Sequence, residues 1–295
     1  MTEKTIYALG FFDGVHRGHQ ALLTACRSLA DTHGCAAGAV TFTVHPETLL
    51  SGVSPALINT NEDKRELLYA FGAQRVLELP FDEKLQKTHW SVFLNSLLAM
   101  DAAGFVCGDD FRFGAGGLGT PKKLAAFCRK HQLPCTIVPA QLMDGARISS
   151  SHIRSLLEQG DLETANRFLG HPHILSGTVV EGKQLGRTIG IPTANLAYPG
   201  ELLALKRGVY ACKAYADGKT YSAVVNIGTR PTVDGEDMNA EAHLLDFAGD
   251  LYGKILTLAF FQFLRPEQKF DSLEKLQAEI QENARQTRKF FEKSK

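Results

Sequence analysis

The stretch GFFDGVHRGHQALL, residues 10–23, lies between an apolar run and a segment with helical periodicity. It places two glycines, Gly14 and Gly18, and two histidines, His16 and His19, in a strand-to-helix connection. Glycine lets a chain turn sharply and approach a ligand closely, and an imidazole N–H can donate a hydrogen bond to a phosphate oxygen. Because a helix N-terminus also attracts anions, this loop predicts a phosphate site at the carboxyl edge of a parallel sheet.

Two other interpretations of the His-x-x-His spacing stay open at this point. His16 and His19 could ligate zinc, although the sequence offers no third ligand with convincing spacing. The histidines could also do no more than cap the helix that follows them.

Outward from this loop, short apolar strands alternate with helical patterns through the first 170 residues. We predict strands at residues 5–12, 35–42, 75–79, 104–107 and 134–138, and helices beginning near residue 17 and at 62–71, 90–100 and 121–130. This alternation is typical of an α/β fold with a parallel sheet.

The pattern changes after about residue 171. Residues 208–228 predict two strands joined by an Asp217-Gly218 turn, and further strands are expected at 239–247 and 254–264. A terminal helix follows, with one apolar face formed by Leu273, Leu276, Ile280, Ala284 and Phe291. We therefore predict two domains, residues 1–170 with α/β structure and residues 171–295 with a small antiparallel sheet or barrel closed by a helix.

Composition narrows the function classes. The 295 residues include 32 Lys+Arg and 32 Asp+Glu, so there is no basic field for nucleic acid and no polybasic run for an anionic membrane. The longest apolar-rich string, ILTLAFFQFL (255–264), is too short to cross a bilayer. We expect small-molecule ligands as partners and make no prediction of oligomeric state.

Cysteine usage and the N-terminus indicate the compartment. Six cysteines occur without a Cys-x-x-Cys pair, and MTEKTIYALG lacks the basic-then-apolar pattern of a signal peptide. We expect free thiols and a cytoplasmic location.

The string GAGGLG (residues 114–119) fits the dinucleotide pattern Gly-x-Gly-x-x-Gly and raises the alternative of an oxidoreductase. In a dinucleotide site the helix opens inside the glycines, whereas here Thr120 and Pro121 predict a helix that begins after the last one. We interpret the string as a flexible loop.

A second anion-binding segment is predicted near residue 150. Serines at 149–151 precede an apolar helical pattern, so one of them can cap the helix while Arg154 projects from its first turn. A serine-rich linker followed by a surface arginine is the alternative.

The chain contains no Gly-x-x-x-x-Gly-Lys-[Ser/Thr] loop, so a phosphate-transfer site in the second half needs another design. The candidate is GKQLGRTIGIPTANL (182–196), in which Gly182, Gly186 and Gly190 suit a phosphate-covering flap. Thr193 and Asn195 offer neutral oxygens for Mg²⁺. A glycine-rich turn that leads into a strand is the alternative.

Together these motifs resemble the HxGH-type nucleotidyltransferases and, among them, the bacterial bifunctional riboflavin kinase/FAD synthetase family. The resemblance rests on the opening loop and on TFTVHP (41–46), LPF (79–81), GDDFRFG (108–114), RISSSHIR (147–154), PTAN (192–195), GVY (208–210), NIGTRPT (226–232), EAHLLDF (241–247), DLYG (250–253) and FLRPEQKF (263–270). It therefore covers nearly the whole chain.

For the first half, the resemblance implies a Rossmann-like FMN adenylyltransferase domain that makes FAD and pyrophosphate from FMN and ATP. The implied ATP-binding residues are Gly10, Phe12, Asp13, His16, His19, Arg147, Ser150 and Arg154, with both histidines in catalysis. Asp110 and Phe111 would lie on the nucleotide or flavin side.

For the second half, the resemblance implies a β-barrel riboflavin kinase domain that makes FMN and ADP from riboflavin and ATP. Thr193 and Asn195 would bind ATP and Mg²⁺, and Arg265 would contact the flavin. Glu241 would be the general base, which suits a carboxylate because the attacking primary alcohol must lose its proton.

Four positions depart from the family pattern. Val44 stands for a proline, Ser151 for a threonine and Asn283 for an aspartate, and the usually charged loop after GDDFRFG is the neutral GAGGLGT. The neutral loop motivates one alternative, an active kinase with an impaired adenylyltransferase. A non-catalytic flavin-binding regulator is the other.

Overall fold

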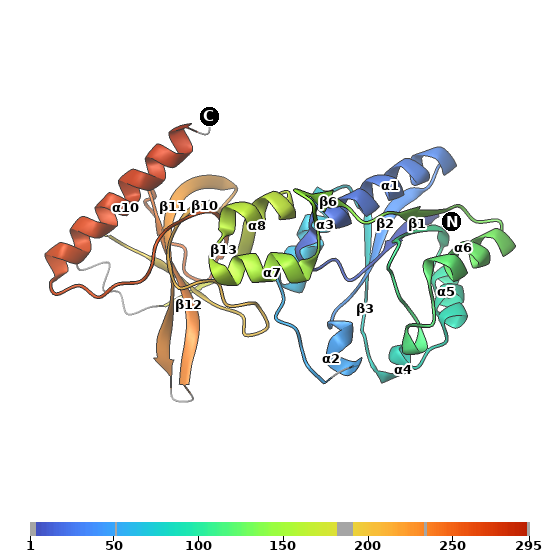
Figure 1. Cartoon of the computed structure of the whole chain (residues 1–295). Helices are drawn as coiled ribbons and strands as arrows, with labels where there is room; N and C mark the ends of the chain where they lie inside the picture. The colour runs from blue at the N-terminus through green and yellow to red at the C-terminus, as the bar shows by residue number, and fades with distance from the viewer. Residues whose placement is uncertain (1–3, 51, 182–190, 233–234, 294–295) are drawn as a thin grey trace. The chain divides into compact units, whose positions relative to one another are not determined.

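The computed structural model describes residues 4–50, 52–181, 191–232 and 235–293. The chain divides into two compact units, which are described separately (Figure 1). The N-terminal unit contains residues 1–55 and 61–150, and the C-terminal unit contains residues 56–60 and 151–295.

The N-terminal unit is built on a parallel sheet. Within the described residues this sheet has five strands in the order β3-β2-β1-β4-β5. Their bounds are β1 (Thr5–Leu9), β2 (Ala36–Phe42), β3 (Arg75–Leu79), β4 (Ala102–Gly108) and β5 (Cys135–Val138). All residues of β1 and β2 are buried, as expected for central strands that are covered on both faces. The predicted α/β class is confirmed.

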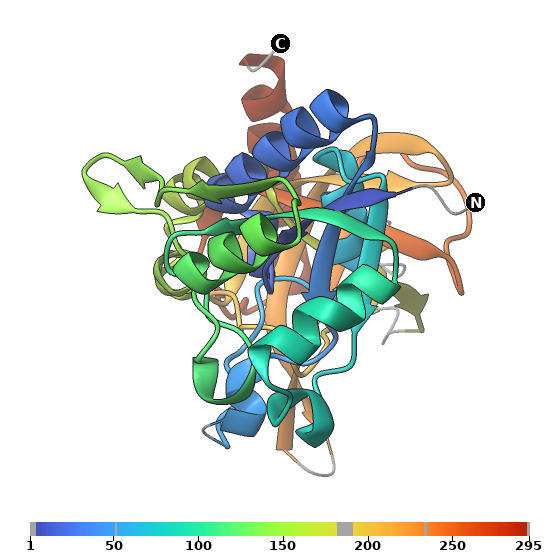
Figure 2. The same ribbon diagram turned by 90° about the vertical axis from the view of Figure 1, so that its right-hand side faces the viewer.

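Helices connect these strands (Figure 2). They are α1 (Arg17–His33), α2 (Pro46–Leu50), α3 (Asn61–Ala70), α4 (Glu83–Gln86), α5 (Trp90–Ala99) and α6 (Pro121–Lys130). Tyr7 and Leu9 pack with buried side chains of α5 and α6 in one core cluster. On α1, Cys26 lies within hydrogen-bonding distance of the Ile6 carbonyl oxygen, at 3.1 Å. The predicted helices are confirmed to within a residue or two.

The C-terminal unit contains a closed antiparallel barrel. The strand order in the described residues is β10-β11-β12-β9-β8-β13. The strands are β8 (His173–Val180), β9 (Ala194–Ala197), β10 (Gly208–Ala216), β11 (Lys219–Thr232), β12 (Gly235–Leu244) and β13 (Ile255–Arg265). Asp217 and Gly218 join β10 to β11 with φ angles of 49° and 72°, which confirms the predicted hairpin turn.

Among the described residues, three helices belong to this unit. The helix α10 (Leu273–Lys293) packs on β10 and β11, and the centre of its Phe291 ring lies 5.1 Å from that of Phe261 in β13. The other two, α7 (Ser150–Gln159) and α8 (Leu162–Leu169), group with the barrel from residue 151 onward. Asn166 of α8 fixes the start of the barrel, because its Nδ2 donates to the Phe260 carbonyl and its Oδ1 accepts from the His173 N–H, both at 2.8 Å.

The buried His173 makes the stability of the folded chain depend on pH. Its ring is buried against Phe260, and neither ring nitrogen has a hydrogen-bond partner in the described part of the chain. Burial, assisted by His171, lowers the pKa of His173 to about 3. The unfolded chain therefore binds a proton near the ordinary pKa of 6.5 that the folded chain does not bind, and stability decreases as the pH falls below that value.

We expect this one group to lower the free energy of unfolding by about 2 kcal/mol between pH 7 and pH 5. Replacing it by an apolar residue, His173→Leu, should remove that loss. Denaturant unfolding of both proteins at the two pH values measures the difference, and every other titrating group is common to both. An equal pH dependence in the two proteins would show that the pKa of His173 is the same in the folded and the unfolded chain.

Candidate active sites

The first candidate site is a cavity of about 460 Å³ in the N-terminal unit. Leu9, Gly108 and Val138, the last residues of β1, β4 and β5, all line it, so it lies at the carboxyl edge of the sheet. Three sequence motifs that are far apart in the chain meet there. Of the site residues predicted from sequence, the cavity is lined by Gly10, His16, His19, Asp110, Phe111, Arg147 and Ser150.

The opening loop contains three residues with positive φ. Phe12 has φ 62°, Gly14 has φ 78° and Val15 has φ 37°, within and beside a single 3-10 turn, η1 (Asp13–Val15). Phe12 and Asp13 are buried, at 0% and 3% exposure, and neither lines the cavity. Phe12 and Asp13 are therefore buried residues that support the loop, whereas other residues of the loop line the cavity.

His16 and His19 form a stacked pair at the cavity wall. Their ring centres are 3.6 Å apart with 14° between the planes. His16 caps α1, since its Nδ1 accepts from the His19 backbone N–H at 3.3 Å, and this leaves Nε2 of a neutral His16 as the N–H donor. The His16 side chain therefore both caps the helix and lines the cavity.

His19 is held in its neutral form. Burial is the main cause that lowers the pKa of His19 well below its ordinary value, and the neighbouring His16 and Lys64 lower it further. Its Nδ1 is buried and has no hydrogen-bond partner among the described residues. At neutral pH, His19 can therefore offer a phosphate one N–H donor and no fixed positive charge.

Arg147 and Asp110 line the same cavity and contact each other. Arg147 Nη2 forms an ion pair with Asp110 Oδ2, and both side chains are at least half exposed. The guanidinium is thus held at the cavity by a carboxylate that an entering phosphate can replace. Ser150 connects this motif to the opening loop, because its Oγ donates to the Asp13 carbonyl oxygen at 2.9 Å.

Arg154 is separate from this set. It lies further along α7 in the part of the chain that groups with the C-terminal unit, and it is not among the residues that line the cavity. Its role toward ATP stays a prediction.

The GAGGLG segment, which the sequence predicts as a flexible loop, forms a turn before a helix. It contains η2 (Ala115–Gly117), and Phe113 pairs with Gly119 across it. Thr120 caps α6 by accepting from the Lys123 N–H at 3.2 Å, with Pro121 in the first turn. The helix begins after the last glycine, which argues against the dinucleotide alternative.

Gly114 is required by this turn. Its φ of 70° and ψ of 175° suit glycine alone, and an added Cβ would lie 2.5 Å from the Trp90 Cα. Gly116, with φ 61° and ψ 18°, has room for a Cβ.

We therefore expect Gly114→Ala to lower the free energy of unfolding by about 3 kcal/mol or more, and Gly116→Ala by only about 1 kcal/mol. Trp90 is the sole tryptophan, and it lies in the N-terminal unit beside Gly114, so its fluorescence during denaturant unfolding measures both variants. Equal effects of the two substitutions would contradict the steric argument.

The second candidate site lies on the barrel, where three strands align polar side chains. Glu241 of β12 is paired with Asn195 of β9 on one side and with Asn226 of β11 on the other. Directly paired residues of antiparallel strands point to the same face, so the three side chains form a row. Asn239 Nδ2 donates to Glu241 Oε1 at 3.1 Å and orients the carboxylate.

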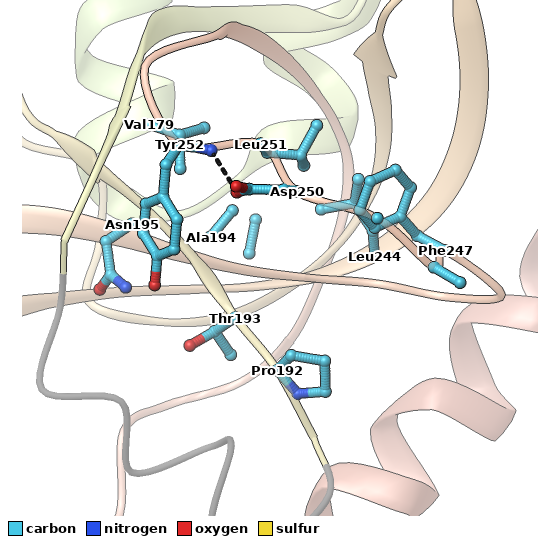
Figure 3. A pocket seen from close by; sticks show the side chains of 13 residues that line it. Val179, Pro192, Thr193, Ala194, Asn195, Leu244, Phe247, Asp250, Leu251 and Tyr252 are labelled. Carbon is cyan, nitrogen blue, oxygen red and sulfur yellow. Dashed lines mark hydrogen bonds between the residues drawn. The ribbon is translucent and has the colours of Figure 1, made fainter.

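Two cavities meet at this row. One of about 510 Å³ is lined by Thr193, Asn195, Asp250 and Tyr252, among others (Figure 3). The other, of about 360 Å³, includes Thr193 again, together with Glu241 and Arg265. Thr193 is therefore shared by two cavities, one of which contains the carboxylate.

Each cavity has a mixed lining. Four apolar side chains of the smaller one, Phe270, Leu273, Leu276 and Ile280, follow β13 in the chain, and the last three belong to α10. In the larger one, Asp250 turns back to accept from the Tyr252 N–H at 2.9 Å (Figure 3). Val179, Leu244 and Phe247 also line the larger cavity, so both cavities combine apolar walls with polar groups, as small-molecule sites commonly do.

Arg265 is already paired. Its Nε lies 2.9 Å from Glu279 Oε1 of α10, and its guanidinium carbon is 5.6 Å from the centre of the Phe270 ring. The charge of Arg265 at the cavity is therefore balanced by a carboxylate of α10.

Sequence reasoning assigned no role in the site to five polar residues of the smaller cavity, Asn226, His243, Glu267, Gln268 and Asn283. Asn226 Nδ2 lies 3.4 Å from Glu267 Oε1. Asn283 is only 2% exposed and lies on the predicted apolar face of α10. A polar residue on an apolar helix face was the available signal. The predicted flap glycines, Gly182, Gly186 and Gly190, fall outside the described residues.

The sequence left a zinc site open, excluded a membrane-spanning segment and predicted free thiols, and each of these can be compared with the structure. In the described ranges, no group of three or more His, Cys, Asp or Glu side chains is arranged to hold a metal ion. Over the same ranges, no helix has the length and hydropathy needed to span a bilayer. All six cysteines are free thiols, as predicted.

Family models match both halves of the chain. A model described as FAD synthetase matches residues 1–152, and a model described as riboflavin kinase matches residues 169–291. A bifunctional riboflavin kinase/FMN adenylyltransferase of Listeria monocytogenes is 35% identical over 98% of this chain and 93% of its own length. The Escherichia coli K12 protein of the same name is 36% identical with the same coverage.

A solved structure is similar over its whole length. The crystal structure of a protein from Streptococcus pneumoniae, named a macrolide-efflux protein, superposes with a TM-score of 0.86 at 28% identity, covering 98% of this chain and 95% of that one. The two chains thus share both folds. With both family models and relatives of 32–37% identity in agreement, this chain belongs to the bifunctional riboflavin kinase/FMN adenylyltransferase family, and it makes FMN from riboflavin and ATP and then FAD from FMN and a second ATP.

Proposed function

We propose that the two reactions use the two candidate sites separately, with adenylyl transfer in residues 1–170 and riboflavin phosphorylation in residues 171–295. The observation that carries this proposal is the pair of barrel cavities that share Thr193, one lined by Glu241 and the other by Asn195. A kinase needs two such neighbouring volumes, one for each substrate, with a base near the point where they meet.

In the kinase reaction, riboflavin occupies the cavity of about 360 Å³ and ATP the cavity of about 510 Å³. The primary hydroxyl of the ribityl chain attacks the γ-phosphorus of ATP, and the bond from that phosphorus to the β–γ bridging oxygen breaks. Glu241 accepts the hydroxyl proton, and FMN and ADP are the products. Asn239 keeps the carboxylate oriented through its 3.1 Å hydrogen bond.

Thr193 and Asn195 are the proposed Mg²⁺ ligands. Both line the larger cavity, and Asn195 is only 5% exposed, so their oxygens lie where the ATP phosphates would enter. Neutral oxygen ligands fit Mg²⁺, which proteins commonly bind together with substrate phosphates. When bound, the ion would neutralise phosphate charge, while the two side chains fix its position. Arg265 is proposed to contact the flavin.

In the adenylyl transfer, a phosphate oxygen of FMN attacks the α-phosphorus of ATP, and pyrophosphate leaves as the bond to the α–β bridging oxygen breaks. His16 and His19 donate N–H groups to the phosphates, and Arg147 exchanges Asp110 for a phosphate. Gly10, Phe12, Asp13 and Ser150 shape the loop, Asp110 and Phe111 face the nucleotide or flavin, and Arg154 is proposed as a further phosphate ligand. No covalent enzyme intermediate is needed.

The direct test is to incubate the purified chain with riboflavin, ATP and Mg²⁺ and to separate the flavins by chromatography. We expect FMN to appear first and FAD to follow, and we expect FAD alone when FMN replaces riboflavin. Accumulation of FMN without FAD would favour the alternative of an impaired adenylyltransferase with the neutral GAGGLGT loop. Formation of neither product would favour a non-catalytic flavin-binding regulator.

A cytoplasmic location is proposed on the six free thiols.

A further inference from the structure

Lys64 is a buried lysine behind the adenylyltransferase cavity. It lies in α3, on a helix that the sequence predicts without any role for this residue, and it is only 2% exposed. Burial of an ammonium group is strongly unfavourable unless it is paired and hydrogen-bonded. The contacts of Lys64 therefore indicate what it does.

Those contacts join two chain segments at the carboxyl edge of the sheet. The Nζ donates to the Phe42 carbonyl oxygen at 2.8 Å, where β2 ends. It also lies 4.3 Å from the centre of the Phe11 ring, in the opening loop. Thr41 Oγ1 donates to the Phe11 carbonyl at 2.8 Å, so Phe11 is held from both its ring and its backbone.

The charges around Lys64 belong to the same loop. Asp13 of η1 is the strongest charged partner, Glu78 of β3 and Glu62 of α3 also attract the ammonium group, and His19 of α1 is repelled by it. Burial outweighs the three carboxylates and lowers the pKa of Lys64 to about 8, so the group remains mostly protonated at pH 7.

Lys64 acts through its neighbours, because it does not itself line the cavity. Phe11 and His19, which it contacts or repels, both line it. A buried positive charge at this place has two effects. It disfavours a second positive charge on His19, and it offsets negative charge of Asp13, Glu62 and Glu78 that would otherwise repel anions from the cavity.

We propose that Lys64 is a positioning residue of the adenylyltransferase reaction, whose buried charge holds the opening loop in its phosphate-binding form and increases the affinity of the cavity for the phosphates of ATP. This inference rests on the proposed assignment of adenylyl transfer to the cavity lined by His16 and His19. It assigns a function to a residue outside the cavity wall.

The test compares Lys64→Met, which keeps the length of the side chain without its charge, with Lys64→Arg, which keeps the charge. At pH 7 we expect Lys64→Met to lower kcat/KM for ATP in FAD formation by about tenfold or more, mainly through KM. Riboflavin phosphorylation by the same protein should be unchanged. Lys64→Arg should retain most of the FAD-forming activity.

The pH profile distinguishes a charge effect from a structural one. In the wild type, kcat/KM for ATP in FAD formation should decrease as the pH rises above about 8, because this parameter reports the free enzyme. The ratio of wild type to Lys64→Met should therefore fall from about tenfold at pH 7 toward one at pH 9.5. Lys64→Arg should keep its activity there. In NMR titrations, the pKa of His19 should rise in Lys64→Met.

Three outcomes would overturn the proposal: an unchanged kcat/KM in a folded Lys64→Met, an equal loss in both reactions, or a ratio that does not depend on pH. If Lys64→Met does not fold, the profiles of the wild type and Lys64→Arg decide, since an identical alkaline decrease in both would exclude Lys64. The variant His19→Ala separates this failure from failure of the site assignment. FAD formation that survives His19→Ala refutes the site, whereas its loss together with an unaffected Lys64→Met refutes only the role of Lys64.

Discussion

Glu241→Gln strongly reduces FMN formation and leaves the conversion of FMN to FAD at the wild-type rate. This is the result that we expect from the position of the carboxylate in the smaller barrel cavity, next to the Thr193 that both cavities share. A glutamine keeps the size of the side chain and an oxygen for the hydrogen bond from Asn239. The substitution therefore removes mainly the base.

The expected loss of kcat is about 10²–10⁴-fold, the usual contribution of a general base to proton transfer. The measurement is initial-rate FMN formation from riboflavin and ATP, with flavins separated by chromatography. The FMN-to-FAD reaction of the same preparation serves as the control for folding and concentration. A loss in both reactions would contradict separate sites, and a loss confined to the KM for riboflavin would reduce Glu241 to a binding residue.

The fold could be predicted from the sequence where local patterns decide it. Alternating strands and helices, the Asp217-Gly218 turn and the cap at Thr120 depend on residues close in the chain, and all are present in the structure. The ends of elements depend on distant partners. The predicted strand at 5–12 stops at Leu9 because Phe12 adopts a left-handed conformation. The strand predicted to reach residue 247 ends at Leu244, shortly before Asp246 with φ 62°.

The candidate sites also divide into residues that local motifs could predict and residues that only contacts between distant segments bring into place. Sequence motifs suggested His16, Asp110 and Arg147 separately, and the sheet brings all three to one cavity. Lys64 could not be found in this way, because a lysine on an amphipathic helix is ordinarily exposed, and its burial depends on the packing of α3 against η1 and the end of β2. Asn226 and Glu267 are 41 positions apart, and their contact depends on barrel closure.

His19→Ala should have the converse effect to the Glu241 variant: it should eliminate FAD formation from FMN while FMN formation continues. His19 lies at the start of α1, stacked on His16 at 3.6 Å, with its ring on the cavity wall. Since its pKa lies well below the ordinary value, the neutral ring can act as a hydrogen-bond donor throughout the physiological range. An N–H donor directed at charge that develops on a leaving pyrophosphate contributes about 10²–10³-fold to kcat.

The matched control is His33→Ala, which removes a histidine from the exposed last turn of the same helix. It should leave both reactions within a factor of about two, because an exposed side chain near a helix C-terminus contributes only a fraction of a kcal/mol to stability. FAD formation is measured from FMN, ATP and Mg²⁺ so that the kinase site takes no part. If His19→Ala kept its kcat and lost only affinity for ATP, the histidine would bind the ground state and the transition state equally, and transition-state stabilisation would then have to come from His16 and Arg147.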